Sequence, residues 1–241
     1  MTGNFAGRSE EETAKFRAVM DEKTDVLLRL ISEHVSPPAS ILIVGCGSGI
    51  EAGLFAHFFN CHVTGIDIGA DYEFQRTEAA PAELLLMDAR SMSFADETFD
   101  LVYSFHALEH IQGYRRALAE MSRVLKRTGS YCVGTPNSER LVGYVQTAEP
   151  LVKKIRYNLR DLYARLRGRW SNELGAHAGF SRLTLLADCV AAFGAGTDIS
   201  DKYYLSLYPR HAALIQASVV SGLARWIFPS VYIIGRKHAR S

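Results

Sequence analysis

The stretch Ile41-Leu42-Ile43-Val44-Gly45-Cys46-Gly47-Ser48-Gly49 decides the fold of this chain. Its four consecutive apolar residues are typical of a strand that is buried on both faces, as in a parallel sheet. Three glycines at alternate positions then indicate a turn, and the apolar spacing of Ile50–Phe59 predicts a helix. Glycines let a backbone approach closely, and a helix start has unpaired N–H groups, so this motif favours an anionic ligand. On the motif alone, a tight connection without a ligand is the alternative.

The composition is that of an ordinary soluble globular protein. A chain of 241 residues with 48% hydrophobic and 22% charged residues can bury one sizeable α/β core. Its 27 Lys and Arg nearly balance its 26 Asp and Glu, so bulk charge does not favour a nucleic-acid partner. The scattered cysteines Cys46, Cys61, Cys132 and Cys189 predict neither a zinc site nor a disulfide framework. We therefore expect a cytoplasmic protein, and the polar stretch Met1–Lys23 does not fit a secretory signal peptide.

Strand and helix patterns alternate along the chain. We expect a helical segment over residues 1–38, with a helix at Arg8–His34, and a single domain over residues 39–241. Further elements are predicted as strands at Cys61–Asp67, Glu83–Met87, Phe99–Phe105 and Ser130–Thr135, and as a helix at Tyr114–Lys126. Alternation of this kind predicts an α/β fold with a doubly wound, mostly parallel sheet.

Four polar or glycine positions follow the apolar runs at the predicted strand ends. These positions are Gly45, Asp67, Asp88 and Ser104. Ligands of such sheets bind at the carboxyl ends of the strands, so we expect the four positions to meet on one rim.

Several motifs in order resemble the class I S-adenosylmethionine-dependent methyltransferases. They are ILIVGCGSG, GIDIG, LLMDARSMSFADETFDLVYSFHALEHI and ALAEMSRVLKRTGSYCVGTPN, which together cover about residues 39–137. The resemblance is greatest to the group with small-molecule acceptors that includes the ubiquinone-pathway O-methyltransferases. It implies S-adenosyl-L-methionine as cofactor and a Rossmann-like, seven-stranded sheet whose last strand runs antiparallel. Tyr203–Leu207 and Val231–Gly235 are the candidates for the final pair of strands.

The resemblance also implies roles for individual residues. Gly45, Cys46, Gly47 and Gly49 would lie under the methionine part of the cofactor, and Asp67 would bind the ribose hydroxyls. Ile68 would cover the adenine, whose edge would be bound by Asp88 and Ala89. Ser104 and Phe105 would surround the sulfonium. Singly, Asp67 and Asp88 could each cap a turn instead, but two acids at successive strand ends favour the cofactor. One departure is Ile43, where the family often carries an acidic residue.

A nicotinamide-dependent dehydrogenase is the nearest rival on the same fold. Its G-x-G-x-x-G fingerprint requires a small residue at position 50, which is Ile50 here. A dehydrogenase would also not require the motifs that lie between Asp88 and Pro136.

Methyl transfer from a sulfonium depends on holding the acceptor atom behind the methyl group. A hydroxyl acceptor also benefits from a general base, and histidine titrates near neutral pH. His106, His110 and His177 are the candidate bases, with Glu109 adjacent to one of them. His106 is preferred because it follows the fourth strand, whereas packing or loop roles are the alternatives for His110 and His177.

A basic helix is expected in an insertion at about residues 138–180. Leu151, Ile155, Leu159, Leu162 and Leu166 recur at helical spacing among seven Lys and Arg residues. A lid over an anionic acceptor, contact with an anionic membrane, and a helix that packs its apolar face on the sheet are all compatible with this pattern.

We expect no transmembrane segment, although the chain is largely apolar from Ala212 to Ile234. A helix to about Ala224 and a strand at Ser230–Gly235 explain this stretch better. The sequence therefore predicts a methyltransferase of a small molecule, with no nucleic-acid partner. A lipid-linked or phosphorylated acceptor at a membrane surface, or a non-catalytic cofactor-binding module, are the alternatives.

Overall fold

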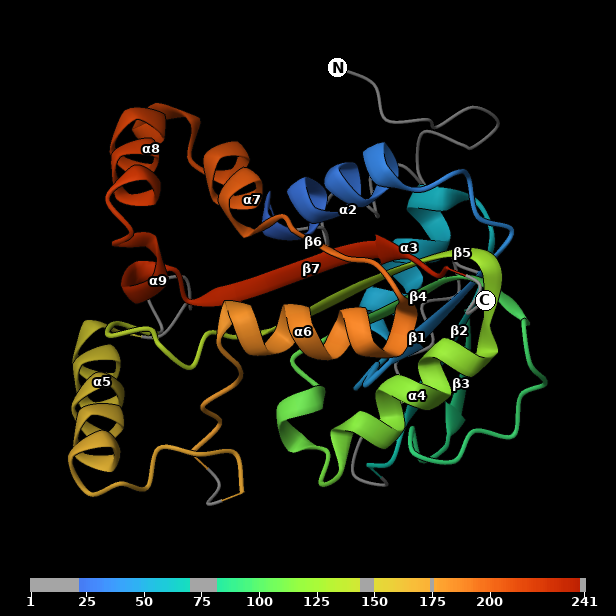
Figure 1. Ribbon diagram of the computed structural model, residues 1–241, viewed down its shortest axis with the longest axis horizontal. Coiled ribbons are helices and arrows are strands. Elements are labelled where there is room, and N and C mark those ends of the chain that lie inside the picture. The colour runs from blue at the N-terminus through green and yellow to red at the C-terminus, as the bar shows by residue number, and fades with distance from the viewer. Residues whose placement is uncertain (1–21, 70–81, 144–149, 174–175, 239–241) are drawn as a thin grey trace.

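In the part of the chain that the structure describes, a seven-stranded sheet has helices on both faces (Figure 1). The computed structural model describes residues 22–69, 82–143, 150–173 and 176–238. The strands are β1 (Ser40–Val44), β2 (His62–Asp67), β3 (Ala82–Leu86), β4 (Phe99–Phe105), β5 (Leu125–Pro136), β6 (Thr197–Asp198) and β7 (Ser230–Arg236). The α-helices are α2 (Glu22–His34), α3 (Ile50–Phe59), α4 (Tyr114–Val124), α5 (Leu151–Leu166), α6 (Arg182–Phe193), α7 (Ser200–Leu207), α8 (Ala212–Val220) and α9 (Ala224–Ile227). The part of the predicted first helix before Glu22 lies outside the described residues.

The alternation of side chains along β1 builds two hydrophobic layers. Ile41 and Ile43 point into a cluster with apolar residues of α2, α3 and α7. Leu42 and Val44 point to the opposite face, into a cluster with α4 and α6. Because successive side chains of a strand face opposite sides, a continuous apolar run is needed to bury both faces. This confirms that β1 is buried on both faces, as its sequence predicts.

The sheet order is β3-β2-β1-β4-β5-β7-β6. Strands β1 to β5 pair in parallel, and β7 runs antiparallel to both β5 and β6. The doubly wound fold class and its antiparallel C-terminal strand are thus confirmed. The direction of winding reverses between β1 and β4, which is where ligands bind in open α/β sheets.

One of the two strands predicted for the C-terminal pair is wrong. Val231–Gly235 lies within β7, but Tyr203–Leu207 belongs to helix α7. Tyr203, Tyr204 and Leu207 are all buried, and this three- and four-residue spacing places them on one helical face against the core. The strand beside β7 is instead the two-residue β6.

The basic helix is present as α5, but its apolar face does not pack on the sheet. Leu151, Ile155, Leu159, Leu162 and Leu166 are each between 50% and 78% exposed. The interpretation of α5 as a helix packed through its leucines is therefore wrong. The reason is that its polar face makes the contacts with the rest of the protein, as described below.

The apolar C-terminal stretch is broken into short elements. The helix expected to extend to Ala224 ends at Val220, and Gly222 follows with a φ of 76°. Helix α9 and strand β7 complete the stretch. Among the helices of the described residues, none has both the length and the apolar character needed to cross a membrane.

Candidate active site

The glycine turn after β1 is shaped by its neighbours in the sheet. Gly45 and Cys46 donate their N–H groups to the Ile66 carbonyl, at 2.8 and 3.1 Å. Gly45 has a φ of 79°, and a Cβ at this position would lie 2.3 Å from the Cβ of Ala107. Only glycine satisfies both the backbone conformation and the space. The turn therefore brings its backbone directly against the segment that follows β4.

The first cavity lies over this turn, at the carboxyl ends of the strands. It has a volume of about 570 Å³. The predicted residues that line it are Gly45, Gly47, Asp67, Ile68, Asp88, Ala89, His106 and His110. Three of the four positions predicted for the rim, Gly45, Asp67 and Asp88, thus line a single cavity, whereas Ser104 does not.

The Asp67 carboxylate holds the backbone around this cavity. Its Oδ2 accepts from the Gly47 N–H at 2.9 Å, and its Oδ1 accepts from the Gly69 N–H at 2.9 Å. The side chain therefore caps the following turn and also fixes the glycine loop, although it still faces the cavity. Ile68 next to it is 68% exposed, which leaves an apolar surface open to a planar ligand.

Asp88 is held by Arg90 on the same rim. The two side chains form an ion pair at 2.8 Å, and hydrogen bonds from Arg90 lower the pKa of Asp88 to about 2. Arg90 also donates to the Gln112 carbonyl at 3.2 Å. Asp88 is therefore ionised at neutral pH and is kept at the cavity edge by a partner that the sequence motif did not single out.

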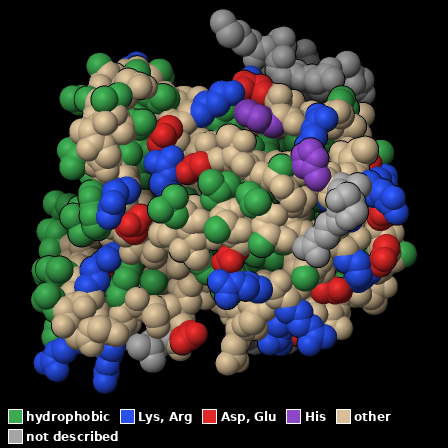
Figure 2. All heavy atoms as spheres, viewed as in Figure 1, with side chains coloured by type: hydrophobic (Ala, Val, Ile, Leu, Met, Phe, Trp, Pro, Cys, Tyr) green, Lys and Arg blue, Asp and Glu red, His purple; other side chains and the backbone are tan. Residues whose placement is uncertain are grey.

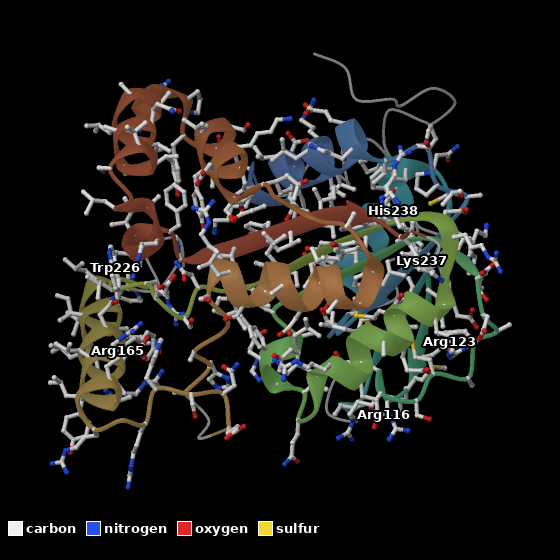
Figure 3. All side chains as sticks on the ribbon, in the orientation of Figure 1. Arg116, Arg123, Arg165, Trp226, Lys237 and His238 are labelled. Carbon is white, nitrogen blue, oxygen red and sulfur yellow. The ribbon has the colours of Figure 1, made fainter. Side chains whose placement is uncertain are left out.

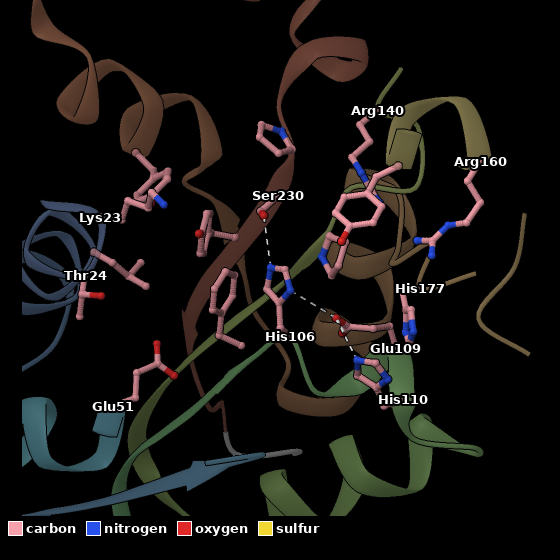
Figure 4. A pocket seen from close by; sticks show the side chains of 17 residues that line it. Lys23, Thr24, Glu51, His106, Glu109, His110, Arg140, Arg160, His177 and Ser230 are labelled. Carbon is pink, nitrogen blue, oxygen red and sulfur yellow. Dashed lines mark hydrogen bonds and ion pairs between the residues drawn. The ribbon is translucent and has the colours of Figure 1, made fainter. Parts of the chain in front are cut away.

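A second and larger cavity, of about 810 Å³, adjoins the first. Its walls are formed by α2, α5, β7 and the segment after β4 (Figure 4). Much of its lining is basic or aromatic. These side chains are Lys23, Phe105, Arg140, Tyr157, Arg160, His177, Tyr203 and Tyr232. A cavity of this volume can enclose most of a small organic molecule.

His106 and His110 line both cavities, so they stand at the junction between them. His106 has a φ of 52°, in the left-handed region that only a few per cent of residues other than glycine adopt. Its Nε2 lies 3.5 Å from Ser230 Oγ, and its Nδ1 lies 3.7 Å from Glu109 Oε1. The ring of His177 lies 4.6 Å from that of His110.

Glu109 lies buried beneath the two histidines. Its side chain is 1% exposed, and neither of its carboxyl oxygens has a hydrogen-bond partner among the residues that the structure describes. His106 and His110 approach it at 3.7 and 3.9 Å (Figure 4). Burial raises the pKa of Glu109 to about 7. A carboxyl group with this pKa exchanges a proton near neutral pH.

The histidines themselves are shifted in the opposite direction. Desolvation, with Arg140 and His110 as further causes, lowers the pKa of His106 to about 4, although 47% of its side chain is accessible from the cavity. Burial also lowers the pKa of His110. Both imidazoles are therefore neutral at pH 7 and able to accept a proton.

The structure brings most of the predicted site residues together, but not all of them. Cys46, Gly49 and Ser104 line neither cavity. Ser104 is fully buried and donates to the Val44 carbonyl at 3.0 Å, so its hydroxyl ties β4 to β1. Phe105 faces the larger cavity rather than the smaller one.

Several cavity residues come from segments that the sequence motifs did not include. They are Glu51, Arg140, Tyr157, Arg160 and Ser230, together with Glu109, which the motif had placed only beside a candidate base. Glu51 accepts a hydrogen bond of 3.1 Å from Tyr103. Ile43, at the position where related proteins often carry an acid, is buried in the core. No periodicity distinguishes these positions, because they meet only when α5 and β7 fold back over β4.

Comparisons with known proteins agree with this geometry. Residues 42–133 match a family model described as a methyltransferase domain. The chain is 32% identical over 138 residues to the O-methyltransferase rstn1 of Aspergillus nomiae, which covers 50% of this chain and 61% of that protein. It is 31% identical over 165 residues to the O-methyltransferase cnsE of Penicillium expansum, covering 61% and 57% respectively. The matches thus span less than two thirds of these relatives.

Solved structures show the same fold. The YcgJ protein of Bacillus subtilis superimposes with a TM-score of 0.57 at 16% identity, covering 90% of this chain and 99% of that one. The plantazolicin methyltransferase BpumL, solved with S-adenosylhomocysteine, gives a TM-score of 0.58 at 15% identity and covers 95% and 86%. Residues 42–133 thus form a methyltransferase domain, and the motif order and sheet topology around it resemble those of the class I S-adenosylmethionine-dependent methyltransferases.

Proposed function

We propose that the protein transfers the methyl group of S-adenosylmethionine to a hydroxyl group of a small molecule. The observation that carries this proposal is the junction of the two cavities at His106, directly above the buried Glu109. In-line transfer needs a donor and an acceptor on opposite sides of one point, with a base beside the acceptor oxygen. The relatives named O-methyltransferases support the choice of a hydroxyl acceptor.

The smaller cavity is the proposed cofactor site. Gly45 and Gly47 would lie under the methionine part, and Asp67 would accept from the ribose hydroxyls while it keeps the glycine loop in place. Ile68 would cover the adenine, and Asp88 with the Ala89 N–H would bind its edge. Bound cofactor supplies an activated methyl group on a sulfonium, and the protein holds that group in position.

The larger cavity is the proposed acceptor site. Phe105, Tyr203 and Tyr232 offer an aromatic wall, whereas Lys23 and Arg160 add basic side chains to the lining. This combination favours an acceptor with an apolar body and an anionic group. A phosphorylated or carboxylated acceptor is therefore preferred over a neutral one.

His106 is the proposed general base. Its neutral imidazole would take the proton from the acceptor hydroxyl as the oxygen attacks the methyl carbon and the carbon–sulfur bond breaks. Glu109 is a positioning residue, because its carboxylate stabilises the imidazolium that forms 3.7 Å away. Since the pKa of Glu109 is about 7, this support is complete only above pH 7. We expect the rate of methyl transfer to rise with pH through about 7.

Calorimetric titration with S-adenosylmethionine and S-adenosylhomocysteine tests the cofactor site. We expect micromolar binding of both ligands and its loss in Asp67→Ala, which removes the acceptors for Gly47 and for the ribose. Asp96→Ala is the matched control, because this exposed carboxylate pairs with Arg123 away from both cavities. No binding of either ligand to the wild-type protein would overturn the proposal.

Release of S-adenosylhomocysteine in the presence of phenolic acceptors tests the reaction itself. If the His106→Ala variant turns over more slowly but binds the cofactor with unchanged affinity, His106 is supported as the base. Cofactor binding without turnover on phenols, phenolic acids or phosphorylated alcohols would instead support a non-catalytic cofactor-binding module.

A further inference from the structure

Helix α5 is attached to the protein through its polar face. Asn158 forms two hydrogen bonds with the backbone of Gly143, one donated from Nδ2 at 3.1 Å and one accepted by Oδ1 at 2.7 Å. Arg165 donates to the Ser138 carbonyl at 3.0 Å. Asp161, the single acid of the helix, is buried and lies 3.6 Å from Arg140. The residues that anchor α5 are therefore polar, at three- and four-residue spacing.

The apolar residues of α5 point away from the protein. We call this surface the outer face, and its members are Leu151, Val152, Ile155, Leu159, Leu162, Tyr163 and Leu166, between 50% and 78% exposed. Figure 2 shows hydrophobic side chains gathered along the edge of the molecule over α5. A helix on a globular protein normally turns its apolar stripe toward the core, so α5 has the reverse orientation.

Cations border the outer face. At 100° per residue, Arg156 and Arg167 follow directly on the apolar arc, and Lys153 and Arg160 lie just beyond them. All four are exposed. Because Asp161 is directed inward, the exposed surface of α5 has basic and apolar side chains with no acid among them.

Exposed apolar residues also occur on α8, α9 and the turn between them, on the same side of the molecule as α5 (Figure 1). Leu214, Val220, Leu223 and Ile227 are between 49% and 79% exposed. The Leu141 N–H donates to the Trp226 carbonyl at 2.7 Å, and Gly143 bonds to α5, so residues 141–143 connect α9 to α5. Figure 3 shows Trp226 and Arg165 on the same side of the molecule, opposite Lys237 and His238.

We propose that the outer face of α5 docks on the surface of an anionic phospholipid membrane. An apolar arc flanked by Lys and Arg is the pattern of helices that lie in a membrane interface, with the cations on lipid phosphates and the apolar side chains among the acyl chains. Docking of a second copy of this chain through the same face would set the cations of the two copies against each other. The positive charge around the outer face therefore favours an anionic membrane over a second copy of the chain.

Docking would place the acceptor cavity beside the lipid. Tyr157 and Arg160 of α5 line that cavity, so the helix is both a wall of the cavity and the proposed membrane contact. An acceptor with a lipid tail would then enter from the membrane. This consequence rests on the proposed function, whereas the docking itself does not, because it requires neither cofactor nor turnover.

Sedimentation with vesicles tests the docking. We expect the 241-residue chain to sediment with vesicles of phosphatidylglycerol and phosphatidylcholine, and to stay in solution with phosphatidylcholine alone or at high salt. Leu151→Ser/Leu159→Ser should weaken the partition about 100-fold, because both side chains lose their burial in lipid. Lys153→Gln/Arg156→Gln/Arg167→Gln should also weaken it about 100-fold, as expected for three cations at an anionic surface.

Each variant has a matched control. Leu86→Ser/Leu183→Ser replaces two leucines that are 61% and 80% exposed on β3 and α6. Arg29→Gln/Arg127→Gln/Lys202→Gln removes three exposed cations outside α5. We expect both controls to sediment like the wild type. Equal losses in variants and controls, or no sedimentation of the wild type with anionic vesicles, would overturn the proposal. So would a dimer in light scattering that Leu151→Ser/Leu159→Ser dissociates.

Discussion

Helices α4 and α5 have the same kind of sequence and opposite orientations. Both alternate apolar and basic residues with helical period, yet α4 buries Ala117, Leu118, Met121 and Val124 against the sheet. In α5 the single buried residue is Asp161, and the leucines face outward. Amphipathic spacing thus defines two faces of a helix without specifying which of them the protein covers. The surroundings decide, because α4 crosses an apolar sheet whereas α5 contacts backbone carbonyls and an arginine.

The two regions should therefore respond differently to mutation. In the region built around the sheet, substitutions are expected to change catalysis, cofactor affinity or folding. In α5, substitutions of the outer face are expected to leave all three unchanged and to alter membrane binding alone.

The largest effect is expected at Glu109. Glu109→Gln keeps the size of the side chain but removes the charge that would stabilise protonated His106 at 3.7 Å. We expect kcat at pH 8 to fall roughly 100-fold with little change in the KM for the cofactor, in line with general base catalysis. Glu97→Gln, on an exposed carboxylate, is the control. A Glu109→Gln enzyme with wild-type kcat would show that the carboxylate has no part in proton transfer.

The difference between the two helices can be measured by a pair of leucine substitutions. Leu118→Ala on α4 removes a side chain that is 1% exposed, so we expect a loss of about 2–5 kcal/mol in the free energy of unfolding. Leu159→Ala on α5, where the side chain is 60% exposed, should change it by less than about 0.5 kcal/mol. Urea denaturation at equal protein concentration compares them. Similar losses would mean that α5 is buried in solution.

Glu109 should also affect how stability depends on pH. Its pKa is raised from 4.5 to about 7 in the folded protein, so the folded state binds more protons than the unfolded chain between these values. Stability from this group is therefore present below pH 4.5 and lost as the pH rises to 7. Removing the charge with Glu109→Gln should stabilise the protein at pH 8 by about 3 kcal/mol, and by almost nothing at pH 4.5.

Thermal denaturation of this variant at the two pH values measures the effect. His106, whose pKa is lowered to about 4, is largely uncharged at both pH values in both folded proteins, so its own titration contributes little to the difference. An equal shift of Tm at both pH values would show that the carboxyl group is not titrating in this range.

The smallest effect is expected at two glycines with left-handed backbone. Gly45→Ala and Gly222→Ala should both lose about 1–2 kcal/mol of stability from the positive φ. Only Gly45 also has a neighbour in the way, because its Cβ would lie 2.3 Å from that of Ala107, whereas a Cβ at Gly222 meets nothing within 4 Å. We expect calorimetry to show about tenfold weaker S-adenosylhomocysteine binding in Gly45→Ala and wild-type affinity in Gly222→Ala.

Local patterns in the sequence determined most of the fold. The apolar run at Ile41–Val44, the glycines after it and the acids at later strand ends all depend on near neighbours in the chain, so periodicity and turn chemistry predict them. The two-residue β6 was missed because such a short strand has no periodicity. Tyr203–Leu207 was mistaken for it because aromatic residues suit both strands and buried helices.

The sequence alone determined a doubly wound sheet and the rim of Gly45, Asp67 and Asp88 at its strand ends, because each of these parts lies within a single short segment of the chain. Only the tertiary structure decided that Glu109 is buried beneath two histidines, since its pKa depends on the desolvation that the surrounding protein imposes. The tertiary structure also decided which face of α5 is covered. That outcome depends on partners such as Gly143 and Arg140, whose placement no helical pattern contains.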